Sequence, residues 1–178
     1  ITPRGSSSVN SSEIHINVRS LVPKLSELRH LLGETKAAVL AISESWLDKT
    51  IGDNEIHIDG YSVLRRDRNR HGGGVLAYVK DGLAFNRRPD LEVDGLEALW
   101  LDLFLPKTKG IIVSCCYRPP NDHSFLSKLE TIFSKLDLSK ECFILGDLNI
   151  NLLSSGSKLF REYNELLQLF HFKQLITE

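Results

Sequence analysis

The sequence predicts an α/β domain in which mixed β-sheets pack against one another and helices lie outside them. Apolar runs of strand length, such as 111–117, are interspersed with stretches in which leucine and phenylalanine recur at helical spacing. Strands and helices do not follow a strict β-α-β order, which disfavours a simple doubly wound sheet. A chain of 178 residues, 42% of them hydrophobic, is long enough for one domain with one core.

The start of the chain is polar and rich in serine, so we expect residues 1–12 to form a flexible lead-in outside the fold. The domain itself is expected at residues 13–178. It begins with an alternating apolar and polar strand at 13–17. Pro23 suits the first turn of the helix that follows, and Gly33 stands where a C-terminal glycine of that helix is expected.

The rest of the chain supplies more strands and two further helices. A nearly continuous apolar run at 37–42 predicts a strand that is covered on both faces. Glycine and proline clusters separate the expected strands of the middle region, which are 61–66, 75–79, 98–105 and 111–117. The last expected elements are a helix at 125–136, a buried strand at 142–145 and a helix at 159–170.

Composition excludes several classes of protein. The longest apolar runs are far shorter than the roughly 20 residues of a membrane-spanning helix, so we expect no membrane partner. The formal net charge of −1 means that any contact with nucleic acid must come from a local basic patch. Three cysteines lie inside apolar stretches and are expected to be buried thiols, which favours an intracellular location.

Three of the predicted strands run into short polar groups at their ends. These groups are Asn17, the pair Ser43 and Glu44, and the segment from Gly146 through Asp147 to Asn149. Ligand and catalytic residues gather outside the carboxyl ends of strands in α/β folds, so we expect the groups to converge. Carboxylates and amide oxygens suit Mg²⁺ or Mn²⁺. We therefore predict a divalent-metal site at these strand ends.

Each of these motifs alone has a more ordinary interpretation. A Gly-Asp-x-Asn segment is common in turns, and a single glutamate after a strand is usually a solvated loop residue. The order of the motifs along the chain is what favours a catalytic site. The motifs are Asn17-Val18-Arg19-Ser20, Ser43-Glu44-Ser45-Trp46-Leu47, Tyr117-Arg118-Pro119-Pro120 and Gly146-Asp147-Leu148-Asn149.

Together these motifs resemble the endonuclease/exonuclease/phosphatase family, which includes DNase I and the apurinic endonucleases. More narrowly, they resemble the endonuclease domain of non-LTR (LINE-type) retrotransposons. The resemblance covers residues 13–178 almost continuously and includes Arg65-Arg66-Asp67-Arg68, the triple glycine at 72–74 and the segment 172–176. It implies a DNase I-like four-layer sandwich of two mixed sheets flanked by helices, and a metal-dependent nicking of DNA that primes reverse transcription.

The resemblance also implies a role for each matching residue. Glu44 matches the metal-binding glutamate of the family, and Asn17 matches the asparagine that helps to organise metal and phosphate. Asp147 matches the aspartate that orients or deprotonates the attacking water, and Asn149 the asparagine that donates a hydrogen bond to the phosphate. Tyr117 aligns with a tyrosine near the phosphate, although packing of Tyr117 against the following proline is an equal alternative.

Contacts with the DNA backbone are expected from arginines. The run Arg65, Arg66, Arg68 and Arg70, with Arg19 from the first motif, is the candidate set, because phosphate contacts supply most sequence-independent affinity. In a protein that is not a nuclease, such a run of arginines is more often part of a solvated hairpin. Trp46 and Trp100 are expected to anchor the core or a loop, not to stack on bases.

One part of the family pattern is missing. The family completes its site with a later Ser-Asp-His signature, which does not occur here, and the chain stops where the last strands are expected. His171 follows Asp147 in sequence but is expected to lie at a helix end. We therefore predict an incomplete domain that nicks DNA weakly or not at all by itself. Sheet edges left open by missing strands favour self-association.

Three functions remain open at this stage. The leading one is the endonuclease, with DNA as substrate, a reverse transcriptase domain on the same full-length polyprotein as a candidate partner, and a nuclear location that follows from the substrate. A lipid or inositol phosphoesterase of the same fold is the first alternative. A non-catalytic remnant that binds nucleic acid or a partner is the second.

Overall fold

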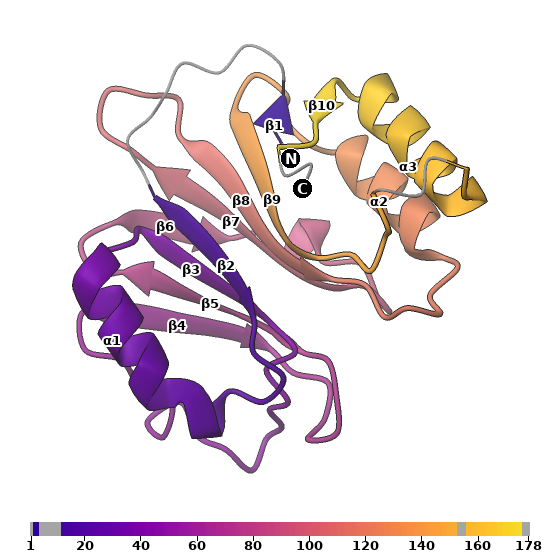
Figure 1. The fold of residues 1–178 in the computed structure, drawn as a ribbon. Helices are drawn as coiled ribbons and strands as arrows, with labels where there is room; N and C mark the ends of the chain where they lie inside the picture. Colours follow the sequence, from indigo (N-terminus) through magenta and orange to yellow (C-terminus); the bar gives the residue numbers. More distant parts are fainter. Residues whose placement is uncertain (1, 4–11, 153–155, 176–178) are drawn as a thin grey trace.

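The structure, a computed structural model, describes residues 2–3, 12–152 and 156–175 and consists of two β-sheets placed face to face between helices (Figure 1). The first sheet has the order β2-β3-β5-β4 and the second the order β6-β7-β8-β9. The strands of the first sheet are β2 (Glu13–Asn17), β3 (Val39–Ser43), β4 (Tyr61–Arg66) and β5 (Val75–Lys80). Those of the second are β6 (Ala84–Arg87), β7 (Glu97–Phe104), β8 (Ile111–Tyr117) and β9 (Glu141–Asp147).

Both sheets are mixed. In the first, β2 and β3 are parallel and their last residues, Asn17 and Ser43, are partners, whereas β3, β5 and β4 pair antiparallel. In the second, β8 and β9 are parallel and end on the partners Tyr117 and Asp147, whereas β6, β7 and β8 pair antiparallel. Each sheet therefore has one parallel pair whose carboxyl ends carry residues of the predicted site.

Helices cover the outer face of each sheet (Figure 1). Helix α1 (Leu25–Thr35), preceded by the short 3-10 helix η1 (Val22–Lys24), lies on the first sheet. Helices α2 (Phe125–Phe133) and α3 (Lys158–Leu169) lie on the second. A second 3-10 helix, η2 (Pro89–Leu91), connects β6 to β7. None of the helices in the described ranges is long and apolar enough to cross a bilayer.

Alternation along the strands builds three separate apolar layers. In β3, Leu40 and Ile42 pack with α1, whereas Val39 and Ala41 point to the other sheet. All five residues of β3 are buried, as expected for a strand covered on both faces. Trp100 of β7 is fully buried in the layer beneath α2 and α3, so its expected place in the core is confirmed. The expected four-layer DNase I-like sandwich is confirmed.

Element boundaries differ from the expected ones by a few residues, and one helix end was wrong. Gly33 lies inside α1, which ends at Thr35. The C-cap is Lys36, which adopts a left-handed conformation at φ 53° and donates its backbone N–H to the Leu32 carbonyl. Strand β6 was not predicted from sequence. It is an edge strand on which Phe85 alone is partly buried, so it lacks the alternation that marks a half-buried strand.

The expected lead-in at 1–12 falls mostly outside the described residues. The backbone of Thr2–Pro3 forms the short strand β1, which pairs antiparallel with β10 (Phe172–Lys173). His171, expected at a helix end, follows the C-cap of α3 and has a φ of 59°. The three cysteines are free and buried, as expected.

Candidate active site

The ends of β2, β3 and β9 meet, and the amide of Asn17 joins them. Asn17 Nδ2 donates to Glu44 Oε1 at 3.2 Å and to Asp147 Oδ2 at 2.8 Å. Asn17 Oδ1 accepts the backbone N–H of Arg19 at 3.3 Å, which orients the amide so that its nitrogen faces the carboxylates. One side chain of the first sheet thus holds a carboxylate from each sheet.

Backbone geometry aims Glu44 into the site. Glu44 has a φ of 56° and Trp46 a φ of 54°, so the chain turns sharply twice just beyond β3. The Glu44 carbonyl accepts the N–H of Ser20 at 2.9 Å. The Trp46 indole Nε1 donates to Glu44 Oε2 at 3.0 Å, so both carboxylate oxygens are held. Trp46 therefore anchors the loop, and it does so through the predicted metal ligand.

Unusual backbone conformations concentrate at this place. Non-glycine residues with positive φ are uncommon and carry a cost of about 1–3 kcal/mol each, and such strain gathers at functional sites. Of the eight described non-glycine residues with positive φ, five belong to the loops that form the site: Arg19, Ser20, Glu44, Trp46 and Asn149. The local cost indicates that these loops are held by their surroundings.

Asp147 is fixed by the turn that follows β9. The backbone N–H of Asn149 donates to Asp147 Oδ1 at 3.1 Å, so each carboxylate oxygen accepts one hydrogen bond. The Asn149 side chain donates through Nδ2 to the carbonyl of Arg118 at 2.7 Å. An amide nitrogen carries two hydrogens, and this bond uses one of them.

The buried side chain of Arg118 stabilises the turn that follows β9. The residue is 2% exposed, and its guanidinium donates to the carbonyls of Leu148 at 3.3 Å and Asn149 at 3.1 Å. Further donations go to carbonyls of its own loop, at Pro120 and Asp122. Gly146 packs against β8 so closely that a Cβ there would lie 1.8 Å from the Cys116 carbonyl oxygen. Both features set the position of Asp147.

Tyr117 lies between the two carboxylate-bearing loops. Burial, followed by the charge and hydrogen-bonding effect of Glu44, raises the pKa of the Tyr117 hydroxyl. The phenol is therefore neutral at ordinary pH. The guanidinium of Arg68 lies 5.9 Å from the centre of the Tyr117 ring, within cation-π range. Tyr117 is thus in contact with the site and is also nearly buried.

His15 is close to the site but was not singled out from the sequence. It lies two residues before Asn17 on β2, and its Nε2 is 3.0 Å from Ser43 Oγ. Burial lowers the pKa of His15, and the nearby charge of Asp147 partly opposes this effect. His15 and Asp147 also line one cavity of about 800 Å³, which runs beside β9 as far as Leu152 and Leu175.

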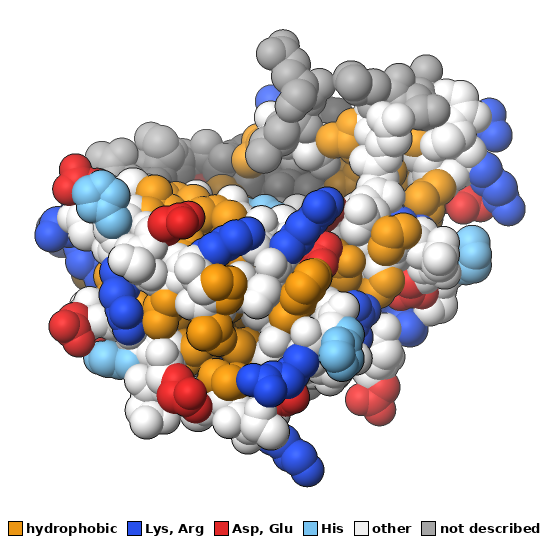
Figure 2. Space-filling view, turned by 60° about the horizontal axis from the view of Figure 1, so that its bottom comes forward, with side chains coloured by type: hydrophobic (Ala, Val, Ile, Leu, Met, Phe, Trp, Pro, Cys, Tyr) orange, Lys and Arg blue, Asp and Glu red, His pale blue; other side chains and the backbone are white. Residues whose placement is uncertain are grey.

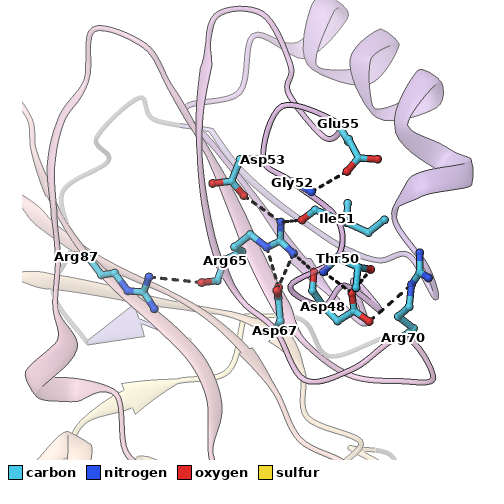
Figure 3. Close-up of polar contacts among 10 residues, drawn as sticks. All are labelled: Asp48, Thr50, Ile51, Gly52, Asp53, Glu55, Arg65, Asp67, Arg70 and Arg87. Carbon is cyan, nitrogen blue, oxygen red and sulfur yellow. Dashed lines mark hydrogen bonds and ion pairs between the residues drawn. The ribbon is translucent and has the colours of Figure 1, made fainter.

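Arg65 was expected to contact DNA, but its guanidinium is hydrogen-bonded within the protein (Figure 3). Its guanidinium donates to both carboxylate oxygens of Asp67, to Asp53 and to the carbonyls of Asp48 and Ile51. These bonds use all five N–H groups of an arginine. Arg65 therefore ties the 48–53 loop to β4.

Two further arginines of the run are also engaged internally. Arg66 donates to the carbonyls of Val93 and Ala98, and Arg68 donates to the Gly72 carbonyl and to Glu97. These bonds link the β4 end and its loop to the other sheet.

Three of the expected DNA-contacting arginines are exposed, and two of them, Arg19 and Arg70, have few internal contacts. Arg70 has a side chain that is 56% exposed with one long ion pair to Asp48 at 3.8 Å, and Arg19 is exposed beside Asn17. Figure 2, in which the bottom of Figure 1 comes forward, shows Lys and Arg side chains scattered among acidic and apolar ones. Of the arginines expected to contact DNA, Arg19 and Arg70 are therefore the exposed ones with few internal contacts.

The donor set at the site fits a divalent cation. Glu44 Oε1 and Asp147 Oδ2 are both brought to the Asn17 amide nitrogen, at 3.2 and 2.8 Å, so two negative oxygens already converge. Mg²⁺ in phosphoryl-transfer sites takes one or two carboxylates together with waters and substrate phosphates. Among the described residues no group of three or more His, Cys, Asp or Glu side chains could hold a metal. Asn17 presents its nitrogen, so its oxygen is not aimed at the carboxylates.

Sequence reasoning missed the residues that support the site. Arg118 was part of a recognised motif, but its burial and carbonyl contacts depend on the β9 turn. Glu97 gave no signal, because a glutamate at the start of a strand is ordinary. Only the pairing of β7 with β8 places Glu97 opposite Tyr117. The alternation of His15 with Asn17 was the one available signal, because residues two apart share a sheet face.

Comparison with known proteins identifies the family and the fold. The sequence model of the Endonuclease/Exonuclease/phosphatase family matches residues 14–175. A search of curated protein sequences gave no significant match. Among solved structures, the chain is similar to the endonuclease domain of TRAS1, a telomere-specific non-LTR retrotransposon, with 17% identity and a TM-score of 0.68. That alignment covers 90% of this chain and 70% of the other.

Two further structures share the fold. The apurinic (AP) endonuclease LMAP from Leishmania major aligns with 20% identity and a TM-score of 0.71, over 89% of this chain and 66% of that one. The 3′ phosphatase NExo from Neisseria, bound to a product DNA hairpin, aligns with 15% identity and a TM-score of 0.63, over 89% and 70%. The chain belongs to the Endonuclease/Exonuclease/phosphatase family of phosphodiester and phosphate-ester hydrolases, and it forms a DNase I-like nuclease/phosphoesterase domain.

Proposed function

We propose that this domain is a divalent-metal-dependent endonuclease that nicks DNA phosphodiesters, and that the nick serves target-primed retrotransposition. The observation that carries the proposal is the hydrogen bonding of Asn17 to Glu44 and Asp147. It joins two carboxylates from opposite sheets at one point, where a cation, a phosphate and a water can meet.

In this proposal Asp147 acts on the attacking water. Each Asp147 oxygen accepts a single hydrogen bond, so lone pairs remain to orient a water and to take its proton. The water oxygen forms a new bond to phosphorus while the bond between phosphorus and the 3′ oxygen breaks. The 3′ oxygen takes up a proton from solvent and leaves as a hydroxyl, and the phosphate stays on the 5′ end. A 3′ hydroxyl is the end that primes DNA synthesis.

The remaining residues hold the phosphate and its charge. Glu44 and Asp147 would hold Mg²⁺ or Mn²⁺, which when bound neutralises charge that develops on the phosphoryl oxygens. Asn149 offers its second amide hydrogen to a phosphoryl oxygen. Tyr117, whose pKa is raised by burial and by the nearby Glu44, stays neutral beside the Glu44 carboxylate. Arg19 and Arg70 would contact neighbouring phosphates.

DNA as the substrate rests on the relatives and on the chemistry of the site. A retrotransposon endonuclease domain, an AP endonuclease and a phosphatase bound to a DNA hairpin share this fold. We infer further that a reverse transcriptase domain on the same polyprotein would extend the nicked end, and that the protein works in the nucleus.

The activity of the 178-residue chain is proposed to be weak. Neither His15 nor His171 is proposed as the acid that protonates the leaving oxygen, because His15 Nε2 is bonded to Ser43 Oγ and His171 follows α3. Loss of one positioned acid from a cooperating site lowers the rate by about 10²–10⁴-fold.

A plasmid-nicking assay tests the proposal. Supercoiled DNA is incubated with the chain in Mg²⁺ or in EDTA, and the product ends are tested for extension by a DNA polymerase. We expect slow nicking that leaves extendable 3′ ends. EDTA should stop this nicking, and Asp147→Asn should reduce its rate by about 10²-fold or more. The matched control is Asp137→Asn, which changes an aspartate beyond α2 that is bonded only locally, to Ser139.

The same assay separates the alternatives. Salt-sensitive DNA binding without any nicking in Mg²⁺ or Mn²⁺ would favour a non-catalytic remnant. Release of phosphate from a phosphoinositide, with no action on plasmid, would favour a lipid or inositol phosphoesterase.

A further inference from the structure

The loop that follows β4 contains the triple glycine at 72–74, and its backbone is hydrogen-bonded to the two residues that follow Glu44. The Trp46 N–H donates to the Gly73 carbonyl at 3.0 Å, and the Ser45 N–H donates to the Gly74 carbonyl at 3.2 Å. Gly73 and Gly74 have φ values of 66° and 79°. The two residues after Glu44 therefore take their position from the peptide groups of this loop.

Glu97 holds this loop from the second sheet. Its Oε2 accepts the backbone N–H of Gly74, and its Oε1 accepts Arg68 Nη1 at 2.8 Å. Arg68 in turn donates through Nε to the Gly72 carbonyl at 2.8 Å. One carboxylate that is 16% exposed thus fixes both ends of the triple glycine.

The space around the loop leaves little freedom. A Cβ added at Gly73 would lie 2.4 Å from Glu97 Oε2 and 2.3 Å from the central carbon of the Arg68 guanidinium. A Cβ at Gly74 would lie 2.6 Å from Ser45 Oγ. The glycines are therefore needed so that Glu97 and Arg68 can approach the backbone.

Two routes lead from Glu97 to Glu44. One passes through the Gly73 and Gly74 peptide groups to Ser45 and Trp46. The other passes through Arg68, whose guanidinium lies 5.9 Å from the centre of the Tyr117 ring, and Tyr117 is near enough to Glu44 for that carboxylate to raise the pKa of its hydroxyl. Loss of the Glu97 charge would weaken both routes together.

We propose that Glu97 is a positioning residue that sets the Glu44 carboxylate through Arg68, Tyr117 and the 72–74 loop. The idea rests on the proposed function for its catalytic meaning, because Glu44 is there a metal ligand. Residues beyond the first ring of ligands orient those ligands, and their loss typically lowers metal affinity or activity by about 10–100-fold.

Glu92 provides a matched control. It accepts two hydrogen bonds from Arg87, at 2.8 and 2.9 Å, and its side chain is 11% exposed. The exposures of Arg87 and Arg68 are both 37%. Glu92→Gln therefore removes an arginine-carboxylate pair of the same kind. Glu92 Oε2 also lies 3.8 Å from Arg66 Nη1 at the end of β4, whereas the Gly74 N–H of the 72–74 loop donates to Glu97.

The two tryptophans supply a direct measurement of the Glu44 position. The Trp46 indole donates to Glu44 Oε2, whereas Trp100 is fully buried elsewhere. A ¹⁵N NMR spectrum of the chain contains one indole N–H signal from each, and Trp46→Phe assigns them. We expect Glu97→Gln and Arg68→Gln to shift the Trp46 signal and leave the Trp100 signal in place, whereas Glu92→Gln leaves both in place.

Titration with Mg²⁺ separates this proposal from the function on which it rests. The Trp46 signal of the parent chain is expected to move with Mg²⁺, and Glu97→Gln should raise the midpoint about 10-fold. If the Trp46 signal of the parent chain does not move with Mg²⁺, the proposed metal site is contradicted. The spectra without metal still test the positioning role of Glu97. The proposal is overturned if both variants keep the parent Trp46 signal, or if Glu97→Gln unfolds the chain while Glu92→Gln does not.

Discussion

Arg65 has no N–H group left for a phosphate, because two aspartates and two carbonyls accept all five. From the sequence, Arg65 and Arg70 looked equivalent. In the structure the Arg65 side chain is 14% exposed and the Arg70 side chain 56%. Internal hydrogen bonding, not charge, therefore decides which of these arginine side chains stays exposed.

This difference predicts opposite effects of two similar substitutions. Arg70→Gln should reduce the slope of log affinity against log salt by about 0.9, as expected for one lost phosphate contact. Arg65→Gln should leave that slope unchanged and lower the melting temperature, because the 48–53 loop loses its anchor. Fluorescence anisotropy with labelled duplex at several salt concentrations measures the first, and thermal unfolding the second. An unchanged slope for Arg70→Gln, with a smaller one for Arg65→Gln, would contradict the assignment.

Single residues differed in how far sequence could predict them. Asn17, Glu44 and Asp147 were predictable because polar residues at strand ends converge when the strands pack. Their mutual contacts confirm the convergence, and their chemical roles stay predictions. Glu97 and Arg118 were not predictable, because their partners lie in loops distant in sequence.

At the scale of single elements, two glycines differ in the space that surrounds their backbone. Gly33 is exposed inside α1, and a Cβ there would meet nothing within 4 Å. Gly146 lies in β9, where a Cβ would lie 1.8 Å from a backbone oxygen of β8. The backbone of a paired strand cannot move aside as a flexible side chain can.

We therefore predict opposite changes in the free energy of unfolding. Gly33→Ala should raise it by about 0.5–1 kcal/mol, because glycine is a poor helix former. Gly146→Ala should lower it by about 1–3 kcal/mol, because the added carbon must push β8 and β9 apart. Urea unfolding followed by circular dichroism measures both. Equal stability of parent and Gly146→Ala would show that the β8-β9 approach is not as close as described.

Elements with a strong apolar pattern were predicted well, and weakly patterned ones were not. β3 and β8 are buried throughout, so their apolar runs were clear. β6 is largely exposed, and β7 supplies its partners, so local sequence carried no comparable signal. Tertiary pairing outweighs local preference at such edge strands.

At the scale of the whole molecule, each sheet contributes half of the site. Glu44 follows β3 in one sheet, and Asp147 ends β9 in the other, so the distance between them depends on how the sheets pack. The layer between the sheets includes Val39, Ala77 and Val113, all nearly or fully buried. Close packing of such interiors resists small displacements, which keeps the carboxylates together.

The cavity beside β9 predicts self-association of the chain. It is lined by apolar side chains that include Leu148, Ile150 and Leu175, and Leu175 is 53% exposed. We expect sedimentation at rising concentration to show species heavier than the 20.1 kDa monomer. Leu175→Lys should restore the monomer. Leu169→Lys, at a residue 63% exposed on α3, should not; an equal effect of both would indicate non-specific association.

Metal binding tests the central claim most directly, because it does not require the chain to be active. Mn²⁺ binding can be followed by electron paramagnetic resonance, with Mg²⁺ as competitor. We predict that the chain binds Mn²⁺ and that Mg²⁺ displaces it. Glu44→Gln and Asp147→Asn should each abolish Mn²⁺ binding or weaken it at least about 10-fold, whereas Glu92→Gln should leave it unchanged. No binding by the parent chain, or binding that neither substitution at Glu44 and Asp147 affects, would contradict the account.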